Sequence, residues 1–283
     1  MPQGDSPWGF FIVNARMQLQ DMWRTPARAG KRLLRVDIVL VPLVLALFLL
    51  GWHFLVRWQQ YPAFILPGPD RVLSRFLAMS SDGTLLAHTL VTVAEIFGGL
   101  VLGLTVAMLI GYGLAKSPVL ERVLSPYIVA SQAVPIVALA PLLVIWFGFG
   151  GLSKVLVCAL TVFFPALVNT IIGIRSVDPD LRALMRSLEA SRTQTFLVLE
   201  VPAALPVFFG GLKVAVTLAV IGAVVGEFVG ADRGLGFLIN LSRGLLDTPM
   251  LFVALFTLVL IAMVLYGAVA LLEYYVLAWR RAE

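Results

Sequence analysis

Three ionisable side chains lie within or beside long apolar segments of this 283-residue chain, and they are the first candidates for chemistry. Glu95 and Lys213 lie well inside two such segments, and Glu227 lies near the end of the second. An ionisable group inside a bilayer costs at least ~2.5 kcal/mol, so it normally faces a partner or water. Because a helix rises about 1.5 Å per residue, Glu95 and Lys213 reach similar depths. The sequence allows an internal Glu95–Lys213 ion pair, a pathway or gate role, or a position near the membrane surface.

No constellation for catalysis or metal binding accompanies these charges. His53 and His88 are isolated and Cys158 is the only cysteine, so neither a metal cluster nor an intrachain disulfide is expected. The segment Gly111–Ser117 resembles a phosphate-binding loop, but Ala115 replaces the glycine required before the lysine and no strand precedes it. We therefore expect a non-catalytic chain that binds no cofactor itself, with Cys158 as an inert buried thiol.

The elements that must position these residues are membrane helices. The chain is 60% hydrophobic and 13% charged, and its apolar runs of about 20 residues are long enough to cross a bilayer. Such continuous runs form helices rather than a barrel, whose strands would alternate. The sequence predicts an all-α integral membrane protein with about six transmembrane helices. The expected spans are Val36–Val56, Leu85–Leu114, Pro126–Phe147, Leu152–Ile174, Pro206–Val229 and Met250–Leu272.

The basic residues set the orientation of these spans. Most of the Lys and Arg residues beside the spans belong to the N-terminal segment 1–35, the connections near residues 116–122 and 175–192, and the C-terminus. Basic loops face the cytoplasm, so both termini are expected there. The basic residues are spread along membrane-flanking loops without interleaved aromatics, which argues against nucleic-acid binding. The expected division is a cytoplasmic segment 1–35 and a transmembrane domain 36–283.

The polar segment 175–205 interrupts the apolar runs and is expected to be a cytoplasmic loop of two short helices. Asp178 can cap the first helix and Pro179 suits its first position, whereas Val201–Pro202 should stop the second. The first helix carries an apolar stripe at helical spacing, formed by Leu181, Leu184, Met185 and Leu188. This pattern fits an amphipathic hairpin on the lipid surface or a helix that enters a groove of a partner.

The remaining candidates lie in the spans and in the outer connection after the fifth span. Residues 232–239 read as a loop followed by a short apolar helix, and Phe237 and Leu238 could close an outer constriction. A plain connector is the alternative. Asn169 is a candidate for the pathway or gate, and a hydrogen bond between helices is favoured for it over a substrate contact. The glycines of the second span should be close-packing positions that also allow bending; they are Gly98, Gly99, Gly103, Gly111 and Gly113.

Several motifs in order resemble the membrane subunits of type I ATP-binding-cassette importers. These motifs are Pro67–Pro69, Ala133–Pro135, Ala140–Leu142, Phe164–Thr170, Ser176–Pro179, Ala183–Pro202 and Gly230–Gly236. Together they are similar to the branch that serves nitrate, sulfonates, taurine, and pyrimidine and riboflavin vitamin precursors. The region 183–202 resembles that family's coupling loop, which docks onto the ATPase subunit. The coupling residues that the resemblance implies are Arg182, Ala183, Leu184, Met185, Leu188, Glu189, Ala190, Ser191, Gln194, Phe196 and Pro202.

The chain departs from the family pattern at the motif that names the loop. Aligned on Pro202, the three naming residues become Ala183-Leu184-Met185, and the usual glycine becomes Glu189. A charged residue there replaces the residue expected at a tight turn between helices. Docking is therefore inferred from the loop as a whole.

The resemblance implies the architecture of the working transporter. Two copies of the chain, or one copy and a close relative, form the translocation path above two ATPase subunits, which hold the ATP and magnesium, and an external binding protein delivers the solute. An ATP-independent secondary transporter is the alternative class, but no inverted repeat is evident. A membrane-embedded enzyme lacks a reactive constellation. The motifs favour a vitamin or its precursor as substrate, riboflavin or a thiamine-precursor pyrimidine, with sulfonate, taurine or nitrate as the alternative.

Overall fold

The computed structural model describes residues 30–281, which form helices and their connections. The chain divides into two units, Met1–Gln60 and Tyr61–Glu283. The first unit contains helix α2 (Gly30–Gln59), whose stretch Pro42–Gln59 is long and apolar enough to cross a membrane. The expected first span falls inside α2. Residues 1–29 of the expected cytoplasmic segment lie outside the described residues.

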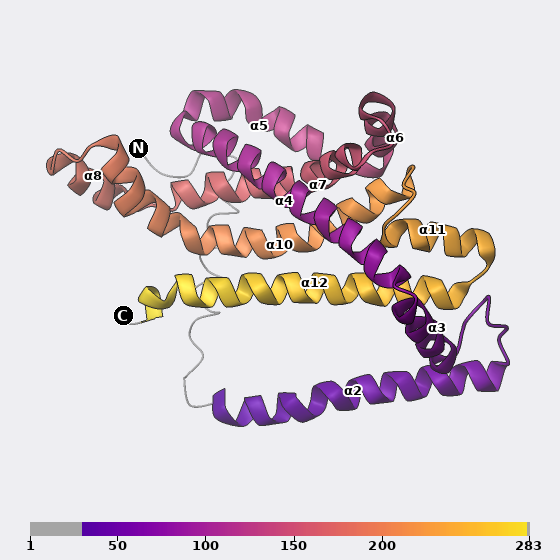
Figure 1. The fold of residues 1–283 in the computed structure, drawn as a ribbon. Helices are drawn as coiled ribbons and strands as arrows, with labels where there is room; N and C mark the ends of the chain where they lie inside the picture. Colours follow the sequence, from indigo (N-terminus) through magenta and orange to yellow (C-terminus); the bar gives the residue numbers. More distant parts are fainter. Residues whose placement is uncertain (1–29, 282–283) are drawn as a thin grey trace. The chain divides into compact units, whose positions relative to one another are not determined.

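The second unit is a set of helices that includes four long apolar stretches among its described residues (Figure 1). The helices are α3 (Pro69–Ser81), α4 (Thr84–Lys116), α5 (Pro118–Gln132), α6 (Ile136–Phe147), α7 (Gly151–Arg175), α8 (Pro179–Ser187), α9 (Arg192–Gln194), the π-helix η1 (Thr195–Glu200), α10 (Val201–Phe228), α11 (Leu235–Leu245), α12 (Thr248–Val276) and the 3-10 helix η2 (Ala278–Arg281). The described residues contain five helices that could cross a membrane, or six if α5 and α6 count as one span. Helices α4, α7 and α12 confirm the expected second, fourth and sixth spans.

The expected third span is wrong as a single straight helix. It is two helices, α5 and α6, that meet at a bend of 93°. The amides of Ala133 and Val134 bond back to Ala130 and Ser131 and end α5. Pro135 then lacks an amide hydrogen and pushes Val134 out of the helical region, so the chain must turn before α6 begins. The apolar composition runs through the bend, which is why hydrophobicity alone did not reveal it.

The expected helix end at Val201–Pro202 is also wrong. The helical path runs without a break from Arg192 to Phe228 through the π-helix η1, where the amide of Val201 bonds to the carbonyl of Phe196. A proline ring clashes with the carbonyl four residues earlier and leaves it without a donor. The wider π turn shifts the carbonyls next to Pro202, so the helix continues through the proline.

Close backbone contacts hold α7 between α4 and α10. A methyl group at Gly103 would approach the carbonyl oxygen of Ala159 to 2.6 Å, and one at Gly222 would approach the Cα of Cys158 to 2.8 Å. Cys158 is fully buried at this junction, and its sulfur lies 3.3 Å from the carbonyl oxygen of Ala219, as expected for an inert thiol. Gly98, Gly99 and Gly111 are also close-packed, whereas no described atom lies near a methyl group placed at Gly113.

Candidate coupling surface and outer polar cluster

Helix α8 forms as its sequence predicts. The carboxylate of Asp178 accepts a hydrogen bond of 2.8 Å from the amide of Asp180, and Pro179 occupies the first turn. At the other end the amides of Glu189 and Ala190 bond back to the carbonyls of Arg186 and Met185, the pattern of a Schellman cap. Glu189 has a φ of +52°. It therefore adopts the left-handed conformation that the family's glycine favours, and the turn between helices is kept despite the substitution.

The apolar stripe of α8 faces outward. Leu181, Leu184 and Leu188 are 47%, 52% and 67% exposed, whereas Met185 is half-buried. Large apolar side chains gathered on one short helix mark a surface for a partner or a membrane. Leu181, Leu184 and Leu188 are thus exposed enough to contact a partner, whereas Met185 is partly covered by the rest of the chain.

The second half of the coupling loop begins with a capping box. The hydroxyl of Ser191 accepts from the amide of Gln194, while the side chain of Gln194 accepts from the amide of Ser191. The ring of Phe196 contacts the ring of Tyr112 edge-on, with centroids 5.2 Å apart. Gln194 remains exposed and Phe196 packs toward α4. The two predicted coupling residues therefore have different surroundings.

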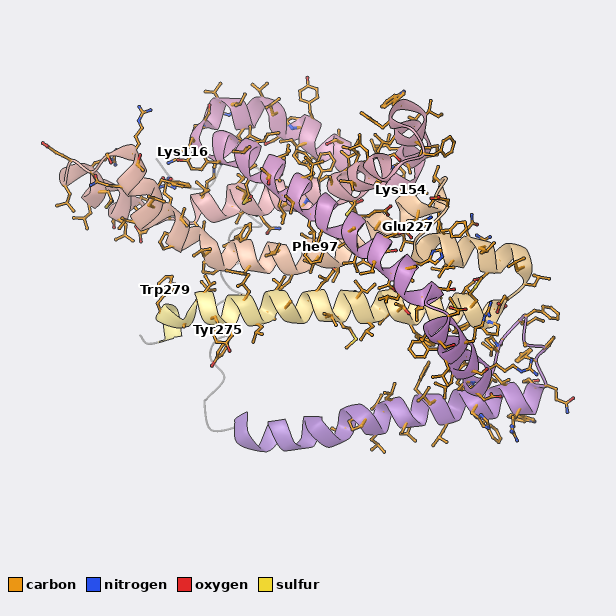
Figure 2. All side chains as sticks on the ribbon, viewed as in Figure 1. Phe97, Lys116, Lys154, Glu227, Tyr275 and Trp279 are labelled. Carbon is orange, nitrogen blue, oxygen red and sulfur yellow. The ribbon has the colours of Figure 1, made fainter. Side chains whose placement is uncertain are left out.

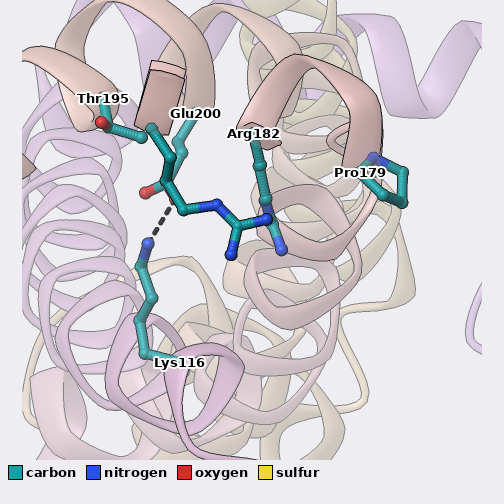
Figure 3. A pocket seen from close by; sticks show the side chains of 6 residues that line it. Lys116, Pro179, Arg182, Thr195 and Glu200 are labelled. Atoms are coloured by element: carbon teal, nitrogen blue, oxygen red, sulfur yellow. Dashed lines mark hydrogen bonds and ion pairs between the residues drawn. The ribbon is translucent and has the colours of Figure 1, made fainter. Parts of the chain in front are cut away.

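Charged contacts fasten this loop to the helix ends around it. Lys116, at the end of α4, pairs with the buried Glu200, and Arg175 pairs with Glu121 on α5. Arg182 donates a hydrogen bond of 2.6 Å to the carbonyl of Ile174. Figure 3 shows a pocket of about 410 Å³ beside these contacts. It is lined by Lys116, Pro179, Arg182, Arg186, Thr195 and Glu200.

The predicted ion pair of Glu95 with Lys213 is wrong. Lys213 pairs instead with Glu273 of α12, and its amine lies 6.0 Å from the ring centroid of Tyr266 on the same helix. Tyr266 and Glu273 are seven residues apart, about two helical turns, so they lie on the same face of α12, the face toward Lys213 on α10. Sequence spacing did not show which helix faces Lys213. Glu95 lies elsewhere, 5% exposed, within electrostatic reach of Glu227 and Lys154.

Asn169 does not form the predicted hydrogen bond between helices. Its amide donates to the carbonyl of Pro165 in its own helix at 2.8 Å. The side chain still packs closely on α10, because a methyl group at Gly211 would meet it at 2.7 Å. Asn169 is thus a close-packing residue of the α7–α10 contact in this structure.

A buried polar cluster lies at the opposite end of α10 from the coupling loop. Figure 2 shows Glu227 and Lys154 toward this end and Lys116 near α8. Glu227 is 1% exposed and accepts a hydrogen bond of 2.6 Å from the hydroxyl of Thr92, and a second bond from the amide of Gly236. Lys154 is 4% exposed and donates to the carbonyls of Phe149 and Gly150. Among the described residues no group could hold a metal ion.

The outer segment forms the loop and helix that the sequence predicts. Leu238 on α11 is 2% exposed, and Phe237 stacks on His88 with ring centroids 5.8 Å apart. The ring nitrogen Nδ1 of His88 lies 2.9 Å from the amide of Gly234 and accepts from it. His88 therefore has partners, contrary to the expectation of an isolated histidine.

Sequence reasoning missed four residues that shape these sites. His88 and Thr92 bind the outer loop, while Glu200 and Glu273 pair with lysines of other helices. His88, Thr92 and Glu95 are spaced by four and three residues on one face of α4, a signal that could have found the cluster. Glu200 and Glu273 carry no such local signal, because their partners are distant in the chain.

Comparison with known proteins identifies the family. The family described as binding-protein-dependent transport system inner membrane component matches residues 99–278. The riboflavin transport system permease protein RibX of Chloroflexus aurantiacus is 48% identical over 239 residues, which cover 84% of this chain and 89% of the relative. The formylaminopyrimidine transport permease protein ThiX of Halalkalibacterium halodurans is 37% identical, with 82% and 92% covered. A putative aliphatic sulfonates transport permease, SsuC of Bacillus subtilis, is 31% identical, with 82% and 84% covered.

These relatives are named as transport permeases, and none is named as an enzyme. Their similarity spans most of this chain, including the coupling loop and the outer cluster. The helical fold with its five or six candidate spans agrees with that assignment. The resemblance drawn from the sequence motifs is thereby confirmed. The chain belongs to the inner-membrane components of binding-protein-dependent transport systems and is a non-catalytic permease subunit of an importer of the ATP-binding-cassette class.

Proposed function

We propose that this permease imports riboflavin, working as a pair of copies with two ATPase subunits and an external binding protein. The ATPase subunits bind and hydrolyse ATP with magnesium, and their movement is transmitted to the permease through the exposed surface of α8. The single observation that carries the coupling role is the exposed apolar stripe of Leu181, Leu184 and Leu188 on a helix fastened at both ends. The 48% identity to a riboflavin permease supports the substrate.

The orientation follows from charge and from aromatic residues. The coupling loop and the connection near Lys116 carry basic residues, as cytoplasmic loops do. The C-terminal end of α12 lies toward the same end of this unit as α8 (Figure 1). There Tyr275 and Trp279 are 68% and 49% exposed, as in the aromatic belt of a membrane surface. We place this end and both termini on the cytoplasmic side of the bacterial inner membrane.

Docking is tested by adding a charge to the stripe. Leu184→Glu puts a carboxylate into the apolar contact and should abolish both copurification of the ATPase and transport, because an unpaired charge is costly to bury. Ser187→Glu is the matched control, since it adds the same charge to an exposed polar residue outside the stripe. Full copurification and transport with Leu184→Glu would contradict the docking assignment.

The substrate is tested with the external binding protein that works with this permease. Quenching of riboflavin fluorescence gives its affinity, and ATP-dependent uptake into proteoliposomes that contain the whole transporter gives the transported solute. Formylaminopyrimidine and taurine serve as competitors, because relatives of lower identity are named for such solutes. Uptake of taurine but not riboflavin would replace the proposed substrate. Uptake without ATP would instead favour a secondary transporter.

A further inference from the structure

The first turn of α11 is held by side chains of two other helices. The amides of Gly234, Leu235 and Gly236 are consecutive donors at the start of this helix, where intrahelical acceptors are missing. They bond respectively to His88 Nδ1 at 2.9 Å, to the hydroxyl of Thr92 at 2.8 Å, and to the carboxylate of Glu227. We call His88, Thr92 and Glu227 the outer clamp. It joins α4 and α10 to the helix that follows the outer loop.

Thr92 and Glu227 form the buried part of the clamp, whereas His88 is half-buried. Thr92 accepts from the amide of Leu235 and donates to one oxygen of Glu227, whose other oxygen accepts from Gly236. Thr92 and Glu227 are 0% and 1% exposed. A carboxylate at a helix start also lies favourably to the helix dipole. Withdrawing α11 would leave a buried carboxylate without its amide donor, so separation at this point is strongly unfavourable.

The fit leaves no room for a side chain at Gly234 or Gly236. Gly234 has a φ of +114°, and a methyl group there would overlap the carboxylate of Glu227. A methyl group at Gly236 would lie 2.8 Å from a carboxylate oxygen of Glu227 and 3.0 Å from the carbonyl oxygen of Val224. By contrast, Gly244 near the other end of α11 has no described atom within 4 Å of the corresponding position. The contact is therefore specific to the first turn.

Two further ionisable residues, Glu95 and Lys154, are buried near the clamp. Glu95 follows Thr92 by three residues on α4 and is 5% exposed. A methyl group at Gly226, the residue before Glu227, would lie 3.1 to 3.3 Å from backbone and side-chain carbons of Lys154. The amine of Lys154 donates to the carbonyls of Phe149 and Gly150 and lies within electrostatic reach of Glu95.

We infer that Glu227 is a positioning residue of transport, which fixes the start of α11 so that α11 moves with α4 and α10 as one body. The outer side then opens by movement of this body, and residues 232–239 do not lift away from it as a separate plug. The inference has two parts. The fixed position of α11 can be measured without ATP, whereas the opening of the outer side by movement of one body rests on the proposed transport function.

The test measures the distance between α4 and α11 in the assembled transporter. Spin labels replace the exposed Leu90 and Asn240 in a Cys158→Ser background, and labelled chains are diluted with unlabelled ones so that pairs within one copy dominate. The distance distribution should be the same in the resting and the ATP-trapped complex. A shift between the two states with the clamp intact would overturn the inference.

Matched glycine variants then test the clamp itself. Gly236→Ala should broaden or shift the resting distance distribution and reduce transport about tenfold or more, since one unmade buried bond is enough for that factor. Gly244→Ala should change neither. An unchanged distribution and full transport with Gly236→Ala would show that the clamp fixes nothing.

Milder variants cover the case in which Gly236→Ala fails to assemble. Glu227→Gln keeps the side-chain shape but has one acceptor oxygen for two donors, and Thr92→Val keeps the volume but lacks the hydroxyl. Both should shift the resting distance, while Thr105→Val on the exposed face of α4 should not. If Glu227→Gln and Thr92→Val shift the resting distance and Thr105→Val does not, but ATP drives no transport, then the proposed function is wrong while the anchoring of α11 is supported. If Glu227→Gln and Thr92→Val leave the distance unchanged, the anchoring fails.

Discussion

The two ends of the α4–α7–α10 core differ in whether the side chains that can make contacts are exposed or already have partners within the chain. At the α8 end, large apolar side chains are exposed and charged pairs fasten only the base of the loop. At the α11 end, the acid Glu227 is buried and both of its oxygens accept hydrogen bonds from the same chain. The first end is incomplete without a partner and the second is complete in itself. The difference predicts assembly defects from changes at one end and stability defects from changes at the other.

The largest expected effect is Glu227→Ala in the purified permease alone. Loss of the carboxylate leaves the amide of Gly236 and the hydroxyl of Thr92 without their acceptor, at about 1–3 kcal/mol for each buried group. Thermal unfolding in detergent should therefore occur at a lower temperature than for the unchanged chain. Leu184→Glu is the counterpart at the other end and should leave that temperature unaltered. Equal destabilisation by both would remove the contrast between the ends.

An intermediate effect is expected at the pair of Lys213 and Glu273 between the ends. Both side chains are about a quarter exposed, at 24% and 25%. Lys213→Ala leaves an acid without its partner and should cost about 1–2 kcal/mol of stability. Combining it with Glu273→Ala should recover most of this loss, whereas combining it with Glu95→Gln should not. Recovery with Glu95→Gln instead would show that Lys213 faces α4 in the working protein.

The smallest effect concerns the left-handed turn after α8. Glu189→Gly should stabilise the chain by about 1 kcal/mol, because glycine adopts a positive φ without the steric cost of a side chain. Glu189→Ala removes the charge but keeps the strain, so it should give no such gain. Unfolding temperatures of the two variants separate the effect of charge from that of conformation. A gain with alanine equal to that with glycine would indicate that the charge is the cause.

The spans were predictable because a membrane helix is determined by its own composition. Apolar runs of sufficient length gave the ends of α4 and α7 to within two residues and those of α12 to within four. The cap at Asp178 and the stripe on α8 followed from local spacing in the same way. The turn at Glu189 was located through the resemblance to the family pattern, in which a glycine usually stands there.

The unpredicted features depend on contacts between distant segments or on choices among local alternatives. Glu273 faces Lys213 only because α12 packs on α10, and nothing near either residue records that packing. Pro202 could stop a helix or be accommodated by a π turn, and Pro135 could bend a span or end one. At Pro135 the composition is apolar on both sides, so hydrophobicity gave no preference there.

The glycine contacts of the core have a mechanical consequence. Gly103 and Gly222 bring backbones within reach of α7 with no compressible side chain between them. A displacement applied at one end of α10 is then not absorbed by rotamer changes along the way. Because close-packed interiors have low compressibility, we expect the three helices to move together as one stiff unit when one end is displaced.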